Sequence, residues 1–142
     1  MEYLSRMRKK RNKTSVAKEA CRWIQRYARL RDTDDNGWGK CCSCGDIVHW
    51  KACDGGHFQP KGRSYNGASI DPRNVHAQCK TCNLTLGGNP AGYQKYMHDH
   101  YTDEDIAELE KLSHETPGRE EMMAALTKYK ALAKKLERNK PM

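Results

Sequence analysis

Apolar positions near the N-terminus of the chain recur with a helical period. Between residues 15 and 31 they fall every three or four residues, and basic side chains lie beside them. The apolar members are Val16, Trp23, Ile24, Tyr27 and Leu30. This spacing predicts an amphipathic helix capped by Thr14 or Ser15, whereas the Asp-, Asn- and Gly-rich residues 32–39 predict a loop.

The helical period returns twice near the C-terminus. Thr102 with Asp105 resembles a capping box at the start of one helix. Thr116 and the proline after it predict the start of another helix, which reaches about Arg138. Its apolar face consists of Met122, Met123, Leu126, Tyr129, Leu132, Ala133 and Leu136. This face can pack on the core of the same chain or on a second copy of the chain.

The middle of the chain has no long amphipathic period. Short apolar runs predict strands at residues 47–52 and 74–78, with a loop at 62–72 between them. A helix is expected after Cys82. The following GGNP segment predicts a break, with Asn89 as the N-cap of the next helix and a proline at its first position.

The composition predicts one small domain with helical extensions. Only 37% of the 142 residues are hydrophobic and 31% are charged, so the core is thin and a bound metal would help it fold. The chain has no run of eighteen apolar residues and no apolar N-terminal signal, so we expect no membrane partner and a cytoplasmic location. Three regions are predicted: a basic arm and helix at 1–39, a central core at 40–97, and C-terminal helices at 98–142.

The net charge of +8 is concentrated at the N-terminus, where residues 1–31 contain eleven Lys and Arg against two acids. A compact basic segment favours a polyanionic partner, and nucleic acid is the default, although a solvated basic tail has the same composition. The candidate DNA contacts in this arm are Arg8, Lys9, Lys10, Arg11 and Lys13.

Two Cys-x-x-C pairs, Cys41 with Cys44 and Cys79 with Cys82, predict a structural Zn²⁺ site. The two-residue gap lets both sulfurs of a pair reach one ion. Cys41 is preferred to Cys42 because Cys42 and Cys44 are too close for the usual turn. Seven cysteines, an odd number, fit poorly with full disulfide pairing, and free thiols are the alternative.

The residues between the two cysteine pairs have the chemistry of phosphodiester hydrolysis. This reaction needs a base that activates water and a cation that neutralises the phosphate. His57 is suited to act as the base, and Asp54 and Asn83 offer oxygen atoms to Mg²⁺ or Mn²⁺. Asn74 can hold a loop through bonds to backbone. Each also has an ordinary interpretation, since a lone His is commonly structural and an Asn after a zinc knuckle commonly caps a helix.

The order of these residues resembles the zinc-containing HNH, or ββα-metal, nucleases, and its Asn version is similar to phage endonuclease VII. The segments DGGHF, NVHAQCKTCN and GGNPAGY resemble still more closely the lambda-type NinG (Rap) recombination proteins, over residues 40–97. The resemblance implies a ββα-metal core with a Cys₄ zinc, and cleavage of branched DNA such as Holliday junctions or D-loops. It also implies a phage protein that acts in the host cytoplasm. A symmetric junction is most simply cut by a homodimer.

The resemblance implies one role for each of three residues: water activation by His57, cation binding by Asn83, and support of the hairpin by Asn74. Many HNH enzymes have a metal-binding acid or His just before the base, where this chain has Gly56. Asp54 is the expected substitute for that ligand. His76, on the same strand face as Asn74, is a further candidate metal ligand.

Lys61, Arg63 and Arg73 lie in or beside the loop between the strands and are candidate phosphate contacts. We therefore expect an α+β protein that acts as an HNH-type DNA endonuclease. One alternative is a nuclease that nicks or cuts duplex DNA irrespective of branching. The other is a zinc-stabilised DNA-binding recombination accessory protein without catalysis. The sequence allows this alternative because Gly56 stands where many HNH enzymes have a metal ligand.

Overall fold

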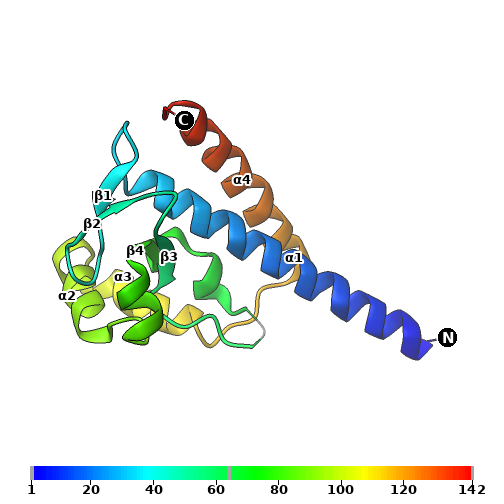
Figure 1. Cartoon of the computed structure of the whole chain (residues 1–142). Coiled ribbons are helices and arrows are strands. Elements are labelled where there is room, and N and C mark those ends of the chain that lie inside the picture. Colours follow the sequence, from blue (N-terminus) through cyan, green and yellow to red (C-terminus); the bar gives the residue numbers. More distant parts are fainter. Residues whose placement is uncertain (1, 64, 142) are drawn as a thin grey trace.

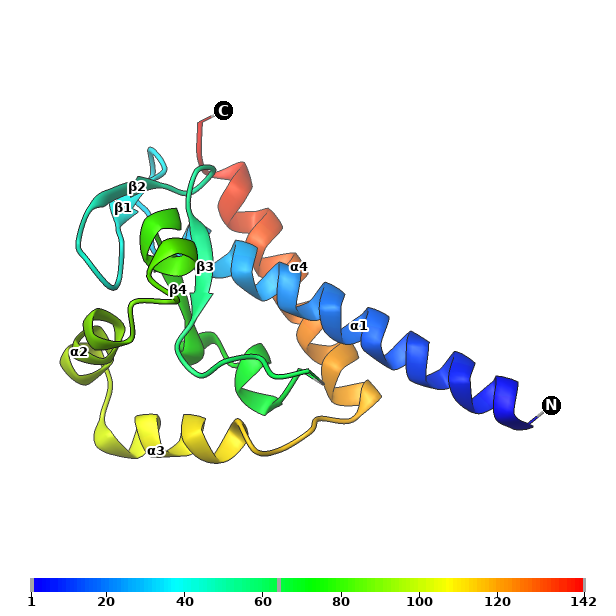
Figure 2. The ribbon, with the colours of Figure 1, turned by 60° about the horizontal axis from the view of Figure 1, so that its bottom comes forward.

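A computed structural model describes residues 2–63 and 65–141, and for residues 2–14 it describes the backbone alone. Within this part of the chain, helices pack around one small antiparallel sheet and a second small sheet lies at the edge of the molecule, which confirms the predicted α+β class (Figures 1 and 2). Short 3₁₀ turns (η1, η2) and one π-helical turn (η3) connect the main elements. In chain order the elements are α1 (Glu2–Arg31), β1 (Trp38–Lys40), β2 (Ile47–His49), β3 (Asp54–His57), η1 (Gly67–Ile70), η2 (Pro72–Asn74), β4 (Val75–Gln78), η3 (Thr81–Thr85), α2 (Pro90–His100), α3 (Asp103–Leu112) and α4 (Arg119–Arg138).

Helix α1 contacts α4, both strands of the β3–β4 pair and η1, and α4 lies alongside it (Figure 1). Ile24 and Ala28 of α1 pack with Val75 of β4 and Tyr129 of α4, and a second cluster joins α1 to α4 through Ala133. The apolar face of α4 is therefore covered by α1 of the same chain. Of the two partners expected for this face, the core of the same chain packs against it, although Met123 stays exposed. The homodimer stays a prediction.

The strands form two separate pairs. β1 pairs with β2, and β3 pairs with β4 in a register that places His57 opposite Val75 and Asp54 opposite Gln78. β3 lies directly against α1, where a Cβ atom on Gly55 would come within 2.8 Å of the Gln25 backbone. This close approach requires glycine and brings α1 next to the polar residues of β3.

Local capping signals predicted two helix starts correctly. Asn89 adopts a left-handed conformation with φ 42° and its side chain accepts a bond from the Gly92 amide at the start of α2. Thr102 and Asp105 form a reciprocal capping box at the start of α3. Both motifs are made within four residues, so neighbouring sequence is sufficient to specify them.

Several elements differ from the predicted ones. The strand predicted at 47–52 ends at His49, and β3 was not predicted as a strand. α1 begins at Glu2 and not at residue 15, because residues 2–14 contain no Gly or Pro that would stop a helix. β1 includes Trp38 and Gly39 from the predicted loop, since pairing with β2 orders them. α4 begins at Arg119, with Gly118 as the N-cap. No helix in the described ranges has both the length and the apolar character needed to cross a membrane.

Candidate functional site

The four cysteines of the two Cys-x-x-C pairs come together at one point. The sulfur atoms of Cys41, Cys44, Cys79 and Cys82 all lie within 4.8 Å of one another, and those of Cys44 and Cys79 are 3.8 Å apart. Around a tetrahedral zinc with Zn–S distances of about 2.3 Å, neighbouring sulfurs lie roughly 3.8 Å apart. The cluster therefore has the size and ligand type to hold a metal ion such as zinc.

The remaining cysteines lie outside this cluster. Cys42 packs with Tyr93, Met97 and Leu109 in an apolar core, and burial raises the pKa of its thiol to about 12. Although Cys41 and Cys42 are adjacent, their side chains enter different environments. The choice of Cys41 over Cys42 as a metal ligand therefore agrees with the geometry.

His57 stands at the end of β3 and faces α1. Its Nε2 lies 3.0 Å from the backbone oxygen of Ser69 and 3.6 Å from the sulfur of Cys21. A carbonyl oxygen can only accept, so Nε2 carries the proton and Nδ1 keeps a free lone pair. Burial lowers the pKa of His57 to about 4, with a smaller contribution from the positive charge of Lys61. The imidazole is therefore neutral at pH 7, and the lone pair at Nδ1 is the position at which a proton would be accepted.

Asn74 holds the backbone on both sides of His57. Its Oδ1 accepts from the Gln59 amide at 2.7 Å, and its Nδ2 donates to the backbone oxygens of Gln59 and Ala68 at 3.0 Å each. Gln59 follows His57 closely, and Ala68 precedes Ser69, whose carbonyl binds the imidazole. The fully buried Asn74 thus has the contacts expected of a residue that positions His57.

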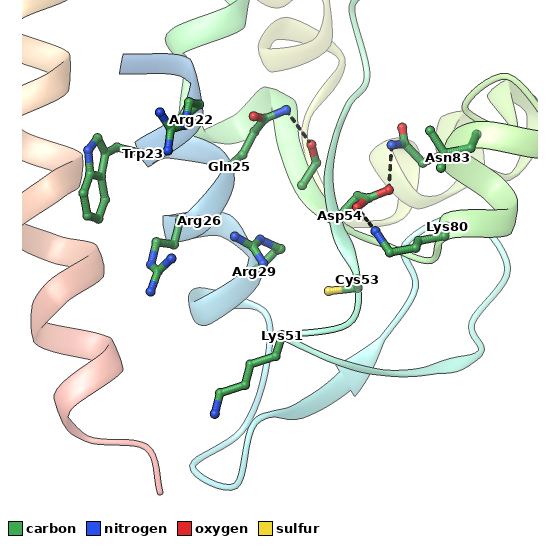
Figure 3. Close-up of a pocket in the computed structure, with 12 residues that line it drawn as sticks. Arg22, Trp23, Gln25, Arg26, Arg29, Lys51, Cys53, Asp54, Lys80 and Asn83 are labelled. Carbon is green, nitrogen blue, oxygen red and sulfur yellow. Dashed lines mark hydrogen bonds and ion pairs between the residues drawn. The ribbon is translucent and has the colours of Figure 1, made fainter. Parts of the chain in front are cut away.

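Asp54 and Asn83 meet on the opposite side of β3, together with Lys80 (Figure 3). Lys80 Nζ donates to Oδ1 of Asp54 at 2.7 Å, and Asn83 Nδ2 donates to Oδ2 at 3.0 Å. Partial burial raises the pKa of Asp54, but these two hydrogen bonds outweigh that effect and the net pKa lies below its ordinary value. Asp54 is thus ionised at neutral pH, and its charge is matched by an ammonium group.

The Asp54–Asn83 pair has the donor set of a hard divalent cation. Turning the Asn83 amide by half a rotation would place its Oδ1 beside the carboxylate, so that both oxygens could face one ion. Mg²⁺ commonly has only one or two protein ligands and keeps several waters, so two ligands suffice. Lys80 would then have to leave the carboxylate. Asp54 and His57 lie three residues apart on a strand, or about 10 Å.

The absence of a side chain at position 56 has a steric cause. A Cβ atom on Gly56 would collide with Oε1 of Gln78. The Gln78 amide is fixed there, because its Nε2 donates at 2.8 Å to both Ser43 Oγ and the Gly88 oxygen. Gln78 therefore fills the space that a side chain at position 56 would need.

The structure gives both ring nitrogens of His76 other partners than the Asp54–Asn83 pair, so we propose no metal contact for it. Its Nδ1 lies 3.0 Å from Tyr93 Oη and its Nε2 lies 2.8 Å from Tyr101 Oη. The Tyr93 hydroxyl donates to the Gly56 oxygen, so His76 must donate from Nδ1 and accept from Tyr101 at Nε2. Only 1% of the residue is exposed. Both ring nitrogens are used, so His76 has the environment of a hydrogen-bonded structural histidine.

The predicted phosphate contacts lie in different surroundings. Arg73 pairs with Asp71 at 2.8 Å and also with Asp105 and Glu108, which joins the loop to α3. Its charge is neutralised by carboxylates, so we propose no phosphate contact for it. Lys61 lies close enough to His57 to influence its pKa, and Arg63 is exposed. The predicted contacts of the N-terminal arm (Arg8, Lys9, Lys10, Arg11 and Lys13) lie outside the residues whose side chains are described.

A basic cleft next to Asp54 was not predicted. This cleft of about 550 Å³ has β3 as its floor, α1 as one wall and η3 as the other (Figure 3). Its charged lining residues are Arg22, Arg26, Arg29, Lys51, Asp54 and Lys80. The three arginines recur every three or four residues on α1, which is a signal in the sequence, whereas nothing local marks Lys51 or Lys80 as their neighbours.

Comparison with known proteins places the chain in a family. The family model described as "Bacteriophage Lambda NinG protein" matches residues 2–139. The chain is also 30% identical over 95 residues to "Protein ninG" of Escherichia phage 933W and, equally, to "Protein ninG" of Enterobacteria phage VT2-Sa. These matches cover 66% of this chain and 43% of each relative, so the chain spans less than half the length of the curated relatives it matches.

No solved structure matches the chain. The family match includes every element from α1 to α4, with the cysteine cluster and the residues around His57 inside it. The chain therefore belongs to the bacteriophage lambda NinG family.

Proposed function

We propose that this chain is a divalent-metal-dependent DNA endonuclease of the ββα-metal type, acting on branched DNA. The observation that carries the proposal is the contact between His57 Nε2 and the Ser69 oxygen at 3.0 Å. It directs the lone pair of Nδ1 away from the backbone in a neutral imidazole, which is the state a general base needs. The antiparallel pair β3–β4, followed by η3 with Asn83, supports the ββα-metal assignment.

In this proposal each residue acts within its observed surroundings. His57 accepts a proton at Nδ1 from the water that attacks the phosphorus, while Nε2 stays bonded to Ser69. Asn74 keeps the imidazole at this angle through its bonds to Gln59 and Ala68. Asp54 and Asn83 would hold Mg²⁺ or Mn²⁺ about 10 Å along β3 from His57 and on the other side of the strand. When bound, the ion would supply charge neutralisation to the phosphate and the leaving oxygen.

The branched substrate and the homodimer follow from the family resemblance. A two-fold junction is most simply cut by two copies of an enzyme. A nuclease with little regard for branching would use the same residues, so only competition between substrates separates the two activities.

A zinc-stabilised DNA-binding protein without catalysis is the second candidate function. The observation in its favour is that Lys80 and Asn83 donate hydrogen bonds to the two carboxylate oxygens of Asp54, so this carboxylate is stable without a metal cation. Such a protein would bind DNA through the same basic surfaces and would show no metal-dependent cleavage.

The test is cleavage of a labelled four-way junction, beside a linear duplex with the same arms, in Mg²⁺ or in EDTA. We expect wild-type protein to cut the junction in Mg²⁺ only, and His57→Ala to bind it but cut at least about a hundredfold more slowly. His114→Ala, at an exposed histidine, is the matched control and should cut normally. Equal cutting of both substrates would favour the unselective nuclease. Tight binding without cutting by wild type would favour the second candidate.

A further inference from the structure

The basic cleft contains five cationic side chains and a single carboxylate in its lining. Three of the cations already have partners. Arg26 forms a bidentate pair with Glu137, Arg29 donates to the Trp50 oxygen at 2.9 Å, and Lys80 binds Asp54. Arg22 and Lys51 are exposed and make no ion pair with any residue that the structure describes. They stand near opposite ends of the cleft, and their charges are available to an anion.

The positive charges on α1 form a row with a regular spacing. Arg22, Arg26 and Arg29 lie on one face of the helix, so Arg22 and Arg29 are separated by about 10 Å along its axis. One strand of B-form DNA carries a phosphate every 3.4 Å or so along the duplex axis. The span of the row is therefore about three phosphate spacings, whereas a single small anion would occupy only one end of it.

The opposite wall of the cleft has a different character. Leu84 follows Asn83 directly and lines the cleft, yet 68% of its surface is exposed to solvent. A large apolar side chain held in water beside a row of cations is suited to a ligand that is itself charged on one side and apolar on the other. A nucleic-acid strand has this character, since its phosphates lie on one side and its sugars and bases on the other.

We infer that the cleft between α1 and η3 is the surface that holds a DNA strand, with Arg22 and Lys51 as its free phosphate contacts and Leu84 against the sugars and bases. This inference rests on the proposed function, because it assigns the substrate strand to the same site. It places most of the strand on α1, outside residues 40–97 that resemble the HNH nucleases. The strand passes over Asp54 and Asn83, and His57 lies beyond the Arg22 end, where Cys21 contacts it.

The test measures binding without cleavage, so its failure is distinct from failure of the endonuclease proposal. A fluorescent four-way junction is titrated in EDTA across a range of salt concentrations, and anisotropy gives the Kd. The cleft variant is Arg22→Ala/Lys51→Ala. The charge-matched control is Lys111→Ala/Lys135→Ala, which removes two exposed lysines from α3 and α4, outside the cleft. Circular dichroism and zinc content verify that both variants are folded.

We expect the cleft variant to bind about tenfold or more weakly near 0.1 M salt, and to lose close to two units from the slope of log K against log salt. The control should keep the wild-type Kd and slope within error. Leu84→Ala should weaken binding without changing the slope, because it removes apolar contact and no charge. Equal losses in the cleft and control variants, or an unchanged slope in the cleft variant, would overturn the assignment. An unchanged Kd for Leu84→Ala would show that Leu84 does not contact the DNA strand.

Discussion

The ammonium group of Lys80 lies 2.7 Å from Oδ1 of Asp54, on the carboxylate that would hold a divalent cation. The two residues come from different elements, since Asp54 begins β3 and Lys80 precedes η3. Lys80 is exposed and flexible, so it can leave when a phosphate offers a competing negative charge. Substrate binding and cation binding would then favour each other, because both withdraw Lys80 from Asp54.

Replacing Lys80 with methionine should strengthen cation binding by the free protein. The variant keeps much of the side-chain volume and removes the competing charge, so we expect Mn²⁺ to bind about five- to tenfold more tightly. Titration of Mn²⁺ followed by electron paramagnetic resonance measures this without any cleavage. Lys111→Met, at an exposed lysine on α3, is the control. Weaker or unchanged Mn²⁺ binding by Lys80→Met would contradict the competition.

The adjacent cysteines 41 and 42 should differ in their effect on zinc. Cys41→Ala removes a sulfur from the four-cysteine cluster, whereas Cys42→Ala removes one from the apolar core around Tyr93. We expect Cys41→Ala to lose stoichiometric zinc and to unfold at a lower temperature, and Cys42→Ala to keep its zinc. Elemental analysis of the purified proteins decides the matter. Loss of zinc from both variants would argue against the selection of Cys41.

Acidification should destabilise the fold through His76. Burial lowers the pKa of His76 to about 3, from an ordinary value of 6.5. The unfolded chain therefore binds a proton in this window that the folded chain does not, so stability is present above pH 6.5 and is lost as the pH falls. Between pH 7 and pH 5 this residue alone should account for about 2 kcal/mol of the free energy of unfolding.

The variant His76→Gln should show a shallower decline of stability with pH, since glutamine keeps hydrogen-bonding groups but does not titrate. Urea denaturation at a series of pH values measures the slope. His114→Gln serves as the exposed control and should follow wild type. The zinc site is common to all three proteins, so its own pH dependence cancels in the comparison. A decline in His76→Gln as steep as in wild type would exclude the burial argument.

The space above Gly56 is filled by Gln78, which predicts a non-additive pair of substitutions. Gly56→Ala should destabilise the protein by about 1–3 kcal/mol, because the new Cβ would collide with Oε1 of Gln78. In the double variant Gly56→Ala/Gln78→Ala the collision is absent, so the free energy lost should be smaller than the sum of the two single losses. A double-mutant cycle of urea unfolding measures the coupling, and strict additivity would show that the two positions are independent.

Several features were readable in the sequence because they depend on near neighbours. The Cys-x-x-C spacing places both sulfurs of each pair toward one ion, and the caps at Asn89 and Thr102 are closed by amides three residues away. Asn74 was expected to hold a loop through bonds to backbone, and it bonds to Gln59 and Ala68. Helix α1 was predicted only in part, since its basic N-terminal half has no apolar period to reveal it.

Tertiary structure decided which polar side chains have partners within the protein and which of them line the basic cleft. Arg73 is adjacent in sequence to the candidate site, yet it is neutralised by carboxylates from α3. His76 has the ring of a metal ligand, but Tyr93 of α2 and Tyr101, which follows that helix, supply the hydroxyls that occupy both nitrogens. Arg22 and Lys80 are far apart in the chain and face one cleft because β3 lies against α1. The residue types and their local spacing are written in the sequence. Which charges meet, and which remain free for a partner, depends on contacts between distant segments that pattern alone does not contain.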